Sequence, residues 1–305
     1  MTSRRRRASG ISVLIWSLAL AGLFVFHRFL PGFGGVLSMV ETVFPWLGIV
    51  VLALVVSAVI LRTGPAAIGA VVVALAWGFV VLPAAIPVPA VTGDDTISIV
   101  SENLEAGNGD AAGIVARLAD RDPDVIVLQE LSADIRDQVS DALAERYPHD
   151  YLVGTVGVWS RTPLSNGERL DLGLGWTRAL SVDVETPLGA TRIFAVHLSS
   201  FRPGEHEDRD TMLGNLASTL AADESERLVV VGDFNTATDD HVLAPVLDQA
   251  RLVRSDAVGF PFTWSSSIPV VALDHALVRG IDAASLHVLD GNGSDHRAIA
   301  VTVGR

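Results

Sequence analysis

The 305-residue sequence contains no cysteine and no lysine. Without cysteine the chain can form neither a disulfide framework nor a thiolate metal site. Every basic residue is arginine, and the arginines that follow Arg62 are scattered along the chain. The missing lysine therefore indicates a codon bias rather than a basic patch that grips nucleic acid. The absence of cysteine does not decide the compartment in which the protein works.

Acidic residues are almost absent from the first 91 residues, which hold six arginines and the single acid Glu41. The other 16 arginines and 34 acidic residues give residues 92–305 a net charge of −18. The composition thus divides the chain into an apolar segment with a basic N-terminal tip and a strongly acidic body. We expect two domains, a membrane anchor in residues 1–91 and a catalytic domain in residues 92–305.

Three apolar runs occupy the first part, at residues 11–30, 43–61 and 65–86. Each is close to the roughly 20 apolar residues that a helix needs to cross a bilayer. They predict a multi-pass anchor of about three transmembrane helices, with the lipid bilayer as a partner. A cleaved signal peptide is the alternative for the first run, but that run is long for a signal core and two more runs follow it.

The arginines at positions 4–7 predict that the N-terminus stays in the cytoplasm. Three spans then place the acidic body on the extracytoplasmic side. Arg62 then falls on the cytoplasmic side, as the positive-inside rule prefers. His27 and Arg28 lie near the outer end of the first span, which the rule disfavours. An anchor of two spans instead of three would place the acidic body in the cytoplasm.

After a proline-rich linker that ends near Gly93, short β-type runs alternate with helical stretches. The predicted strands cover residues 96–101, 124–129, 151–159, 178–184, 192–198, 228–232, 273–278 and 298–303. The predicted helices cover residues 110–119, 133–146, 207–222 and 241–247. This alternation over about 210 residues predicts a single α/β domain.

Polar residues recur where the apolar strands end, which is where a sheet exposes side chains to a shared cleft. The motifs, in order, are Asn103, Gln129-Glu130, Ser160-Arg161-x-Pro163, His197-Leu198, Gly232-Asp233-Phe234-Asn235, Phe262-Thr263-Trp264, Leu273-Asp274-His275 and Ser294-Asp295-His296.

This ordered set resembles the endonuclease/exonuclease/phosphatase superfamily, which includes deoxyribonucleases, apurinic endonucleases, neutral sphingomyelinases and inositol polyphosphate phosphatases. The resemblance covers residues 96–303. A Gly-Asp-Phe-Asn tetrapeptide alone is weak, but this many motifs in the family's order are specific. The resemblance implies a four-layer α/β sandwich of two packed β-sheets flanked by helices, and a metal-dependent hydrolase of phosphodiester or phosphomonoester bonds.

A divalent metal suits such chemistry because phosphoester hydrolysis builds negative charge on oxygen. The carboxylates and carboxamides of these motifs are hard ligands that suit Mg²⁺ foremost, or Mn²⁺ or Ca²⁺. Glu130 is the first candidate ligand, although an acid at a strand end is often only a surface ion-pair partner. Asn103 and Asp295 are expected to complete or orient the metal shell.

The resemblance also implies the acid–base groups. Asp274 would orient His296 and stabilise its protonated form, as base or charge stabiliser for the attacking water. Asp233 would either deprotonate that water or protonate the leaving oxygen, and the sequence leaves both roles open. Asn235 can donate to the phosphate oxyanion.

His197 ends a strongly apolar strand, where a histidine is commonly a satisfied core residue. In the deoxyribonuclease and sphingomyelinase branches a His-Leu at this place resembles a general acid, and we expect that role here. Arg178 contacts either the phosphate or a structural carboxylate.

The substrate stays open among nucleic acid, a lipid headgroup and a small molecule. A body of charge −18 is poorly suited to gripping a long duplex, yet an anchored nuclease and an anchored lipid phosphodiesterase have the same sequence features. The alternative of another class is a membrane scaffold with this fold and no turnover, and it would need one of Glu130, Asp233, Asn235 or His296 to be lost, whereas all are present. No protein partner can be inferred.

Overall fold

The computed structural model describes residues 3–202 and 205–305. The chain divides into two compact units, one of Met1–Ile86 with Asp239–His241 and one of Pro87–Thr238 with Val242–Arg305. Each unit is described by itself.

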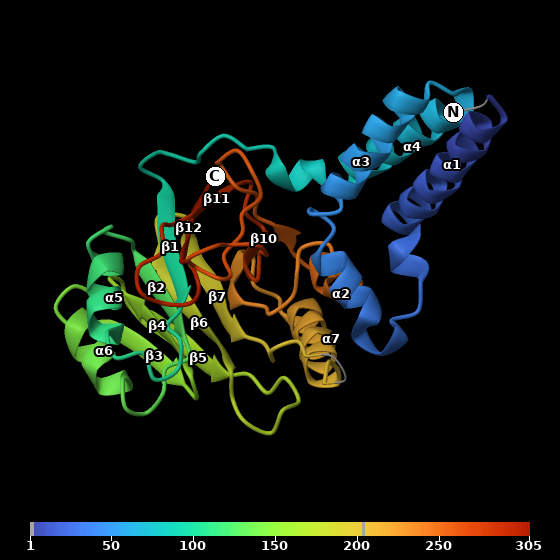
Figure 1. Cartoon of the computed structure of the whole chain (residues 1–305). Coiled ribbons are helices and arrows are strands. Elements are labelled where there is room, and N and C mark those ends of the chain that lie inside the picture. Colours follow the sequence, from blue (N-terminus) through green and yellow to red (C-terminus); the bar gives the residue numbers. More distant parts are fainter. Residues whose placement is uncertain (1–2, 203–204) are drawn as a thin grey trace. The chain divides into compact units, whose positions relative to one another are not determined.

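The first unit is helical (Figure 1). It contains α1 (Ser3–Phe26), η1 (His27–Phe29), η2 (Phe33–Gly35), α2 (Val36–Thr42), α3 (Gly48–Leu61), α4 (Gly64–Val80) and η3 (Leu82–Ala85), where η marks a 3₁₀ helix. Small residues let α1 and α4 approach closely, since a Cβ atom on Gly69 of α4 would lie 2.8 Å from the Cα atom of Leu14. Small residues at such contacts are typical of helices that pack in lipid.

One helix among the described residues, α1 with the turn that follows it (Ser3–Phe29), is long and apolar enough to cross a bilayer. It suits an anchor or a signal sequence. The apolar helices α3 and α4 have only 14 and 17 residues, because turns precede α3 at residues 43–47 and Pro83 follows α4. The second and third spans therefore stay predictions.

The second unit contains two six-stranded β-sheets. The first has the order β11-β12-β1-β2-β4-β3 and the second the order β5-β6-β7-β8-β10-β9. The strands are β1 (Thr96–Asn103), β2 (Val125–Gln129), β3 (His149–Val153), β4 (Val156–Ser160), β5 (Leu164–Arg169), β6 (Ala179–Thr186), β7 (Gly189–His197), β8 (Leu228–Asp233), β9 (Arg251–Leu252), β10 (Asp274–Arg279), β11 (Ala283–Val288) and β12 (Ile299–Gly304). The helices are α5 (Ala111–Ala119), α6 (Arg136–Leu143), α7 (Glu207–Ala222), η4 (His241–Leu243), whose first residue belongs to the first unit, and α8 (Ala244–Leu247).

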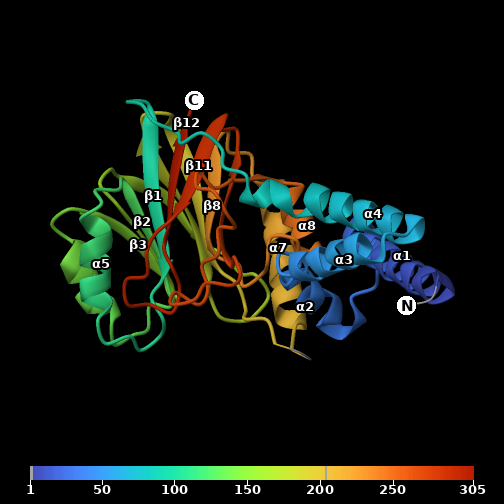
Figure 2. The same cartoon turned by 45° about the horizontal axis from the view of Figure 1, so that its top comes forward.

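The apolar alternation of the strands explains how the layers pack. On β2, Val125 and Val127 point into the core between the two sheets, while Ile126 and Leu128 point toward α5 and α6. The second sheet packs its other face against α7 and α8. Because both faces of the central strands are covered, every residue of β2 is buried. The predicted four-layer α/β sandwich is confirmed (Figures 1 and 2).

Some predicted elements differ from the observed ones. The predicted strand at residues 151–159 is wrong as a single element, because the chain reverses at Gly154, whose φ of 60° suits a turn, and forms the hairpin of β3 and β4. Strands β5, β9 and β11 were not predicted, since they are short or polar and lie at or near sheet edges. Helix α6 is shorter than the predicted 133–146.

Candidate active site

Strand register brings the polar motifs to one end of the sandwich. The last residue of β7, His197, lies beside Asp233 at the end of the parallel strand β8. Asp274, the first residue of β10, pairs with Asp233 in the antiparallel ladder. Asn103 ends β1 in the other sheet and donates from Nδ2 to Oδ2 of Asp233 at 3.0 Å. The two sheets therefore meet at these residues.

Asn103 also joins Asp233 to Glu130. Its Nδ2 atom lies 3.1 Å from Oε1 of Glu130, and the other oxygen of Glu130 accepts from the backbone N–H of Ala106 at 2.7 Å. Two carboxylates thus converge on one amide group. Asn103 and Asp233 are buried, so the hydrogen bond between them meets little competition from water, whereas the Glu130 side chain is 28% exposed.

Asp233 is held by a second amide. Its Oδ1 atom accepts from the backbone N–H of Asn235 at 2.8 Å, and its Oδ2 atom accepts from the Asn235 side chain at 3.0 Å. Burial raises the pKa of Asp233 well above its ordinary value, and the neighbouring Asp274 raises it further. A carboxyl with a raised pKa can hold or release a proton near neutral pH.

His296 and Asp274 form a buried pair, with Nδ1 of His296 2.9 Å from Oδ2 of Asp274. The Nε2 atom of His296 lies 3.9 Å from Oδ2 of Asp233. Burial alone would lower the pKa of His296, but Asp274 and Asp233 outweigh it and raise the pKa to about 10. The imidazole is therefore protonated at neutral pH.

His197 has a different environment from the one the sequence predicts for a general acid. Nη2 of Arg178 lies 2.8 Å from its Nδ1 atom and also contacts Nε2. Because a guanidinium only donates, the ring accepts. Burial lowers the pKa of His197 well below its ordinary value, and Arg178 lowers it further. A neutral His197 therefore holds Arg178 in place, and its predicted role as general acid stays a prediction.

Of the three predicted metal ligands, two are in direct contact and the third lies in the loop beside His296. Asn103 and Glu130 are in contact, whereas Asp295 accepts from Nε1 of Trp264 at 3.4 Å and, among the described residues, makes no hydrogen bond or ion pair to either of them. Its neighbour Ser294 donates to the backbone carbonyl of Asn103 at 2.5 Å. Asp295 thus lies in a loop fastened to the site, and its role as a ligand stays a prediction.

The donor set fits a hard divalent cation. Carboxylates of Asp233 and Asp274 lie close together, since their ligand atoms and that of His296 are within 4.8 Å of one another. Glu130 adds a third carboxylate at the Asn103 amide that also binds Asp233, whereas the protonated His296 does not act as a ligand. Carboxylate oxygens with few nitrogen donors are what Mg²⁺, Mn²⁺ and Ca²⁺ prefer.

Glu102 is a buried acid to which the sequence assigned no role. Its Oε2 atom accepts from Nδ2 of Asn292 at 2.9 Å, so β1 holds the loop that leads to His296. Burial raises the pKa of Glu102 to about 8, although the Asn292 hydrogen bond and His296 oppose the shift. The signal in the sequence was an acid within a predicted strand, directly before the site residue Asn103.

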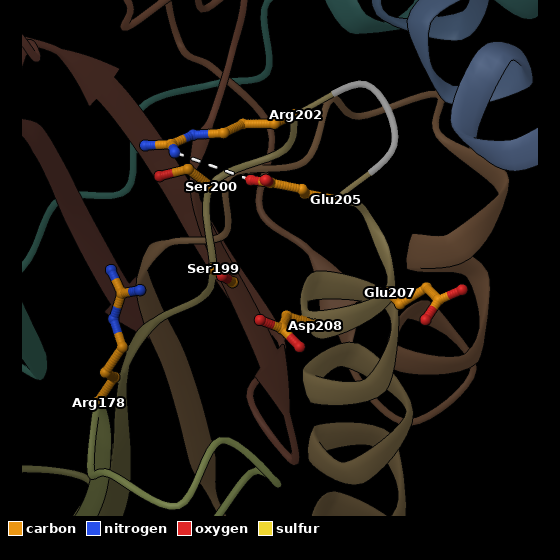
Figure 3. A pocket seen from close by; sticks show the side chains of 7 residues that line it. All are labelled: Arg178, Ser199, Ser200, Arg202, Glu205, Glu207 and Asp208. Atoms are coloured by element: carbon orange, nitrogen blue, oxygen red, sulfur yellow. Dashed lines mark ion pairs between the residues drawn. The ribbon is translucent and has the colours of Figure 1, made fainter.

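A pocket of about 430 Å³ adjoins the site through Arg178 (Figure 3). Its walls carry charge of both signs and two hydroxyl groups, from Arg178, Ser199, Ser200, Arg202, Glu205, Glu207 and Asp208. Burial lowers the pKa of Arg178, while Asp233 and Glu130 oppose that change. The same guanidinium thus faces both the carboxylates and the pocket.

Comparison with known proteins gives one family and many structures of the same fold. The Endonuclease/Exonuclease/phosphatase family matches residues 103–296. No curated protein matches the chain significantly. The chain is similar to sphingomyelinase C from Streptomyces griseocarneus, with 17% identity, a TM-score of 0.55, and coverage of 69% of this chain and 99% of that chain.

It is also similar to TDP2 from C. elegans, with 18% identity, a TM-score of 0.57, and coverage of 69% of this chain and 75% of that chain. A third similar structure is a mutant of beta toxin from Staphylococcus aureus with bound magnesium ions, at 13% identity and a TM-score of 0.56, covering 68% of this chain and 99% of that chain. At these identities the likeness shows the fold.

Proposed function

The chain belongs to the endonuclease/exonuclease/phosphatase family, and from this premise we propose that its second unit is a divalent-metal-dependent hydrolase of phosphodiester bonds. The observation that carries the proposal is the position of Asp233. This buried carboxylate accepts from Asn103 and Asn235 and lies 3.9 Å from the imidazole that Asp274 holds.

Magnesium is the cofactor that we propose, because the donors are mostly carboxylate oxygens and the similar beta toxin structure holds magnesium ions. Glu130 and Asn103 would hold it, with Asp295 orienting the shell from outside. When bound, the cation would neutralise the charge that develops on the phosphate oxygens.

The protein's own groups divide the remaining work. Asp233 either takes the proton of the attacking water or gives one to the leaving oxygen, and its raised pKa suits both roles. Protonated His296, oriented by Asp274, stabilises negative charge in the transition state. Arg178 supplies N–H donors for the phosphate from the wall of the adjoining pocket. The two N–H groups of the Asn235 amide donate to the carbonyl of Leu198 and to Asp233, so its contact with the phosphate requires that one of these bonds be exchanged.

We also propose that the domain works outside the cytoplasm, carried by a multi-pass anchor. The basic N-terminal tip supports this orientation. A nuclease remains one candidate activity for such an enzyme, although the charge of −18 on residues 92–305 opposes a long polyanion.

Hydrolysis of bis(p-nitrophenyl) phosphate by the full chain in detergent tests the activity. We expect turnover with Mg²⁺ or Mn²⁺, loss of turnover with chelator, and a loss of about 10²-fold or more in Asp233→Asn. Asp141→Asn, at an exposed position on α6, is the matched control and should behave as wild type. Absence of metal-dependent turnover, or equal rates for Asp233→Asn and wild type, would contradict the proposal and favour a scaffold without turnover.

A further inference from the structure

Residues 257–272 contain no charged side chain, although they belong to the strongly acidic part of the sequence. We call this segment the uncharged loop. Four of its large apolar side chains are exposed: Val258 at 86%, Ile268 at 73%, Trp264 at 41% and Val270 at 37%. Among the described residues of the second unit, Trp176 is the one other large apolar side chain with such exposure. A gathering of exposed apolar side chains marks an interaction surface.

Hydrogen bonds at its base fix the uncharged loop. The backbone of Trp264 bonds to Val270 and Val271, and Oγ1 of Thr263 accepts from the backbone N–H of Leu273 at 3.1 Å. The apolar side chains are therefore presented by a hydrogen-bonded scaffold. Burial of these side chains in a binding partner would therefore cost little backbone conformational entropy.

The uncharged loop is part of the rim of the candidate active site. Nε1 of Trp264 donates to Asp295, and Trp264 forms a β-bridge with His296. The second exposed tryptophan, Trp176, lies 4.8 Å from the Arg178 guanidinium. Apolar side chains from two segments of the chain thus flank the groups that we assign to the chemistry.

The root of the uncharged loop binds the stretch of chain that follows the apolar helices. The backbone N–H of Val88 donates to the carbonyl of Ser255 at 2.9 Å. Only Ile86 and Pro87 separate Val88 from the end of η3. The three Cα–Cα steps from Ala85 to Val88 span at most roughly 11 Å. If the apolar helices lie in a bilayer, only a few residues of chain therefore separate the last of them from Ser255, at the root of the loop.

We propose that the uncharged loop inserts into the surface of the lipid bilayer and that the adjoining site receives a phosphoester headgroup from that surface. The assignment of the headgroup rests on the proposed phosphodiesterase function. Indole rings favour the boundary between lipid and water, and isoleucine and valine favour the acyl region. Because the loop has no basic residue, its insertion does not need anionic lipid and should be insensitive to salt.

Insertion can be measured without any enzymatic readout. The chain has no cysteine, so Ile268→Cys gives a single attachment point for a nitroxide spin label, and Ala142→Cys at an exposed position on α6 gives the matched control. Both full-length proteins are reconstituted into phosphatidylcholine vesicles. We expect the Ile268 label to collide with oxygen and to be protected from an aqueous nickel chelate, and the Ala142 label to show the reverse. Equal exposure of both labels to the chelate would overturn the proposal and would favour a protein partner for this surface.

The substrate class is tested by comparing two substrates. In Ile268→Asp we expect hydrolysis of sphingomyelin or phosphatidylinositol in phosphatidylcholine vesicles to fall about tenfold or more, since the loss of one buried isoleucine alone approaches that factor. Hydrolysis of bis(p-nitrophenyl) phosphate should change less than about twofold, as should both activities of the control Ile268→Leu. A wild-type chain that cleaves the soluble diester and neither lipid would overturn the headgroup assignment. Failure on the soluble diester would instead contradict the proposed function, and the spin-label result would still decide the insertion.

Discussion

Two residues of the site, Glu130 and Asn235, have positive φ angles of 58° and 47°. Such angles are uncommon for residues other than glycine and persist where the surroundings impose them. The Glu130 side chain accepts from the Asn103 amide that also binds Asp233. The Asn235 side chain donates to Asp233 itself. Local backbone strain thus coincides with the proposed chemistry.

Replacement of Glu130 by glutamine tests the metal assignment. Glu130→Gln keeps the volume but exchanges an anionic oxygen ligand for a neutral one, so we expect a lower affinity for Mg²⁺ or Mn²⁺ and partial recovery of activity at high metal concentration. Titration of activity against metal, with isothermal calorimetry of the same samples, measures the shift. Glu145→Gln, at an exposed position, is the control. An unchanged metal dependence would remove Glu130 from the site.

The pairing of Asp274 with His296 makes a quantitative prediction. His296→Ala and Asp274→Asn should each lower kcat by roughly 10²- to 10⁴-fold, the usual range for positioned proton-transfer groups. The double variant should be scarcely worse than His296→Ala, because the two residues act as one unit. KM should change little, since the interaction lost belongs to the transition state. Additive losses in folded proteins, judged by thermal unfolding, would show that the two residues act independently.

At the scale of the element, Gly232 lets β7 and β8 bring His197 and Asp233 side by side. Its φ is 144°, and a Cβ atom there would lie 2.0 Å from the carbonyl oxygen of Val196. No side chain fits this space without separating the strands. The glycine is therefore required by the close approach of backbone that positions Asp233.

Gly232→Ala is expected to lower the thermal midpoint of unfolding by several degrees and to abolish turnover, because backbone strain and overpacking each cost about 1–3 kcal/mol. Gly93→Ala is a closely matched control, since Gly93 has a φ of 139° but no atom within 4 Å of its added Cβ. It carries the strain of positive φ without the clash. Equal destabilisation of the two variants would show that the conformation matters and the contact with β7 does not.

The sequence predicted those elements whose apolar pattern is strong. The continuous apolar runs of β2 and β8 identify strands that are covered on both faces. Strand β5, with the sequence LSNGER, has no such run because it lies at the edge of its sheet and is mostly exposed. The hairpin turn at Gly154 was missed since apolar residues continue on both sides of it.

Contacts across the sandwich could not be derived from spacing. Asn103 and Asp233 are 130 positions apart and meet only because two sheets pack face to face. Their places at strand ends and the family resemblance predicted one shared cleft, whereas nothing in the sequence predicted the hydrogen bond between them. The acceptor role of His197 toward Arg178 depends on side-chain geometry within buried strands, and no sequence pattern encodes it.

At the scale of the whole molecule, the side of the membrane on which the domain lies depends on whether the number of spans is odd or even. Helix α1 qualifies as a span by length. Only Arg62 and Thr63 separate α3 from α4, so a chain that crosses with α3 must return with α4. The two helices therefore add either two crossings or none. If α1 spans the bilayer, both cases leave an odd total, so the proposed position of the second unit outside the cytoplasm is compatible with one span as well as with three.

Fusion of alkaline phosphatase or green fluorescent protein after Arg305 tests this orientation in a bacterial host. With the four N-terminal arginines inside, the phosphatase fusion should be active and the fluorescent fusion dark, because each reporter matures on one side only. Replacement of Arg4, Arg5, Arg6 and Arg7 by glutamate should weaken this preference, whereas Arg62→Glu should matter less if α3 and α4 do not cross. A bright fluorescent fusion on the wild-type chain would mean either an even number of spans or an N-terminus outside the cytoplasm, and either result would contradict the proposed orientation. Either would place Glu130, Asp233 and His296 in the cytoplasm, and the enzyme would then act on substrates of that compartment.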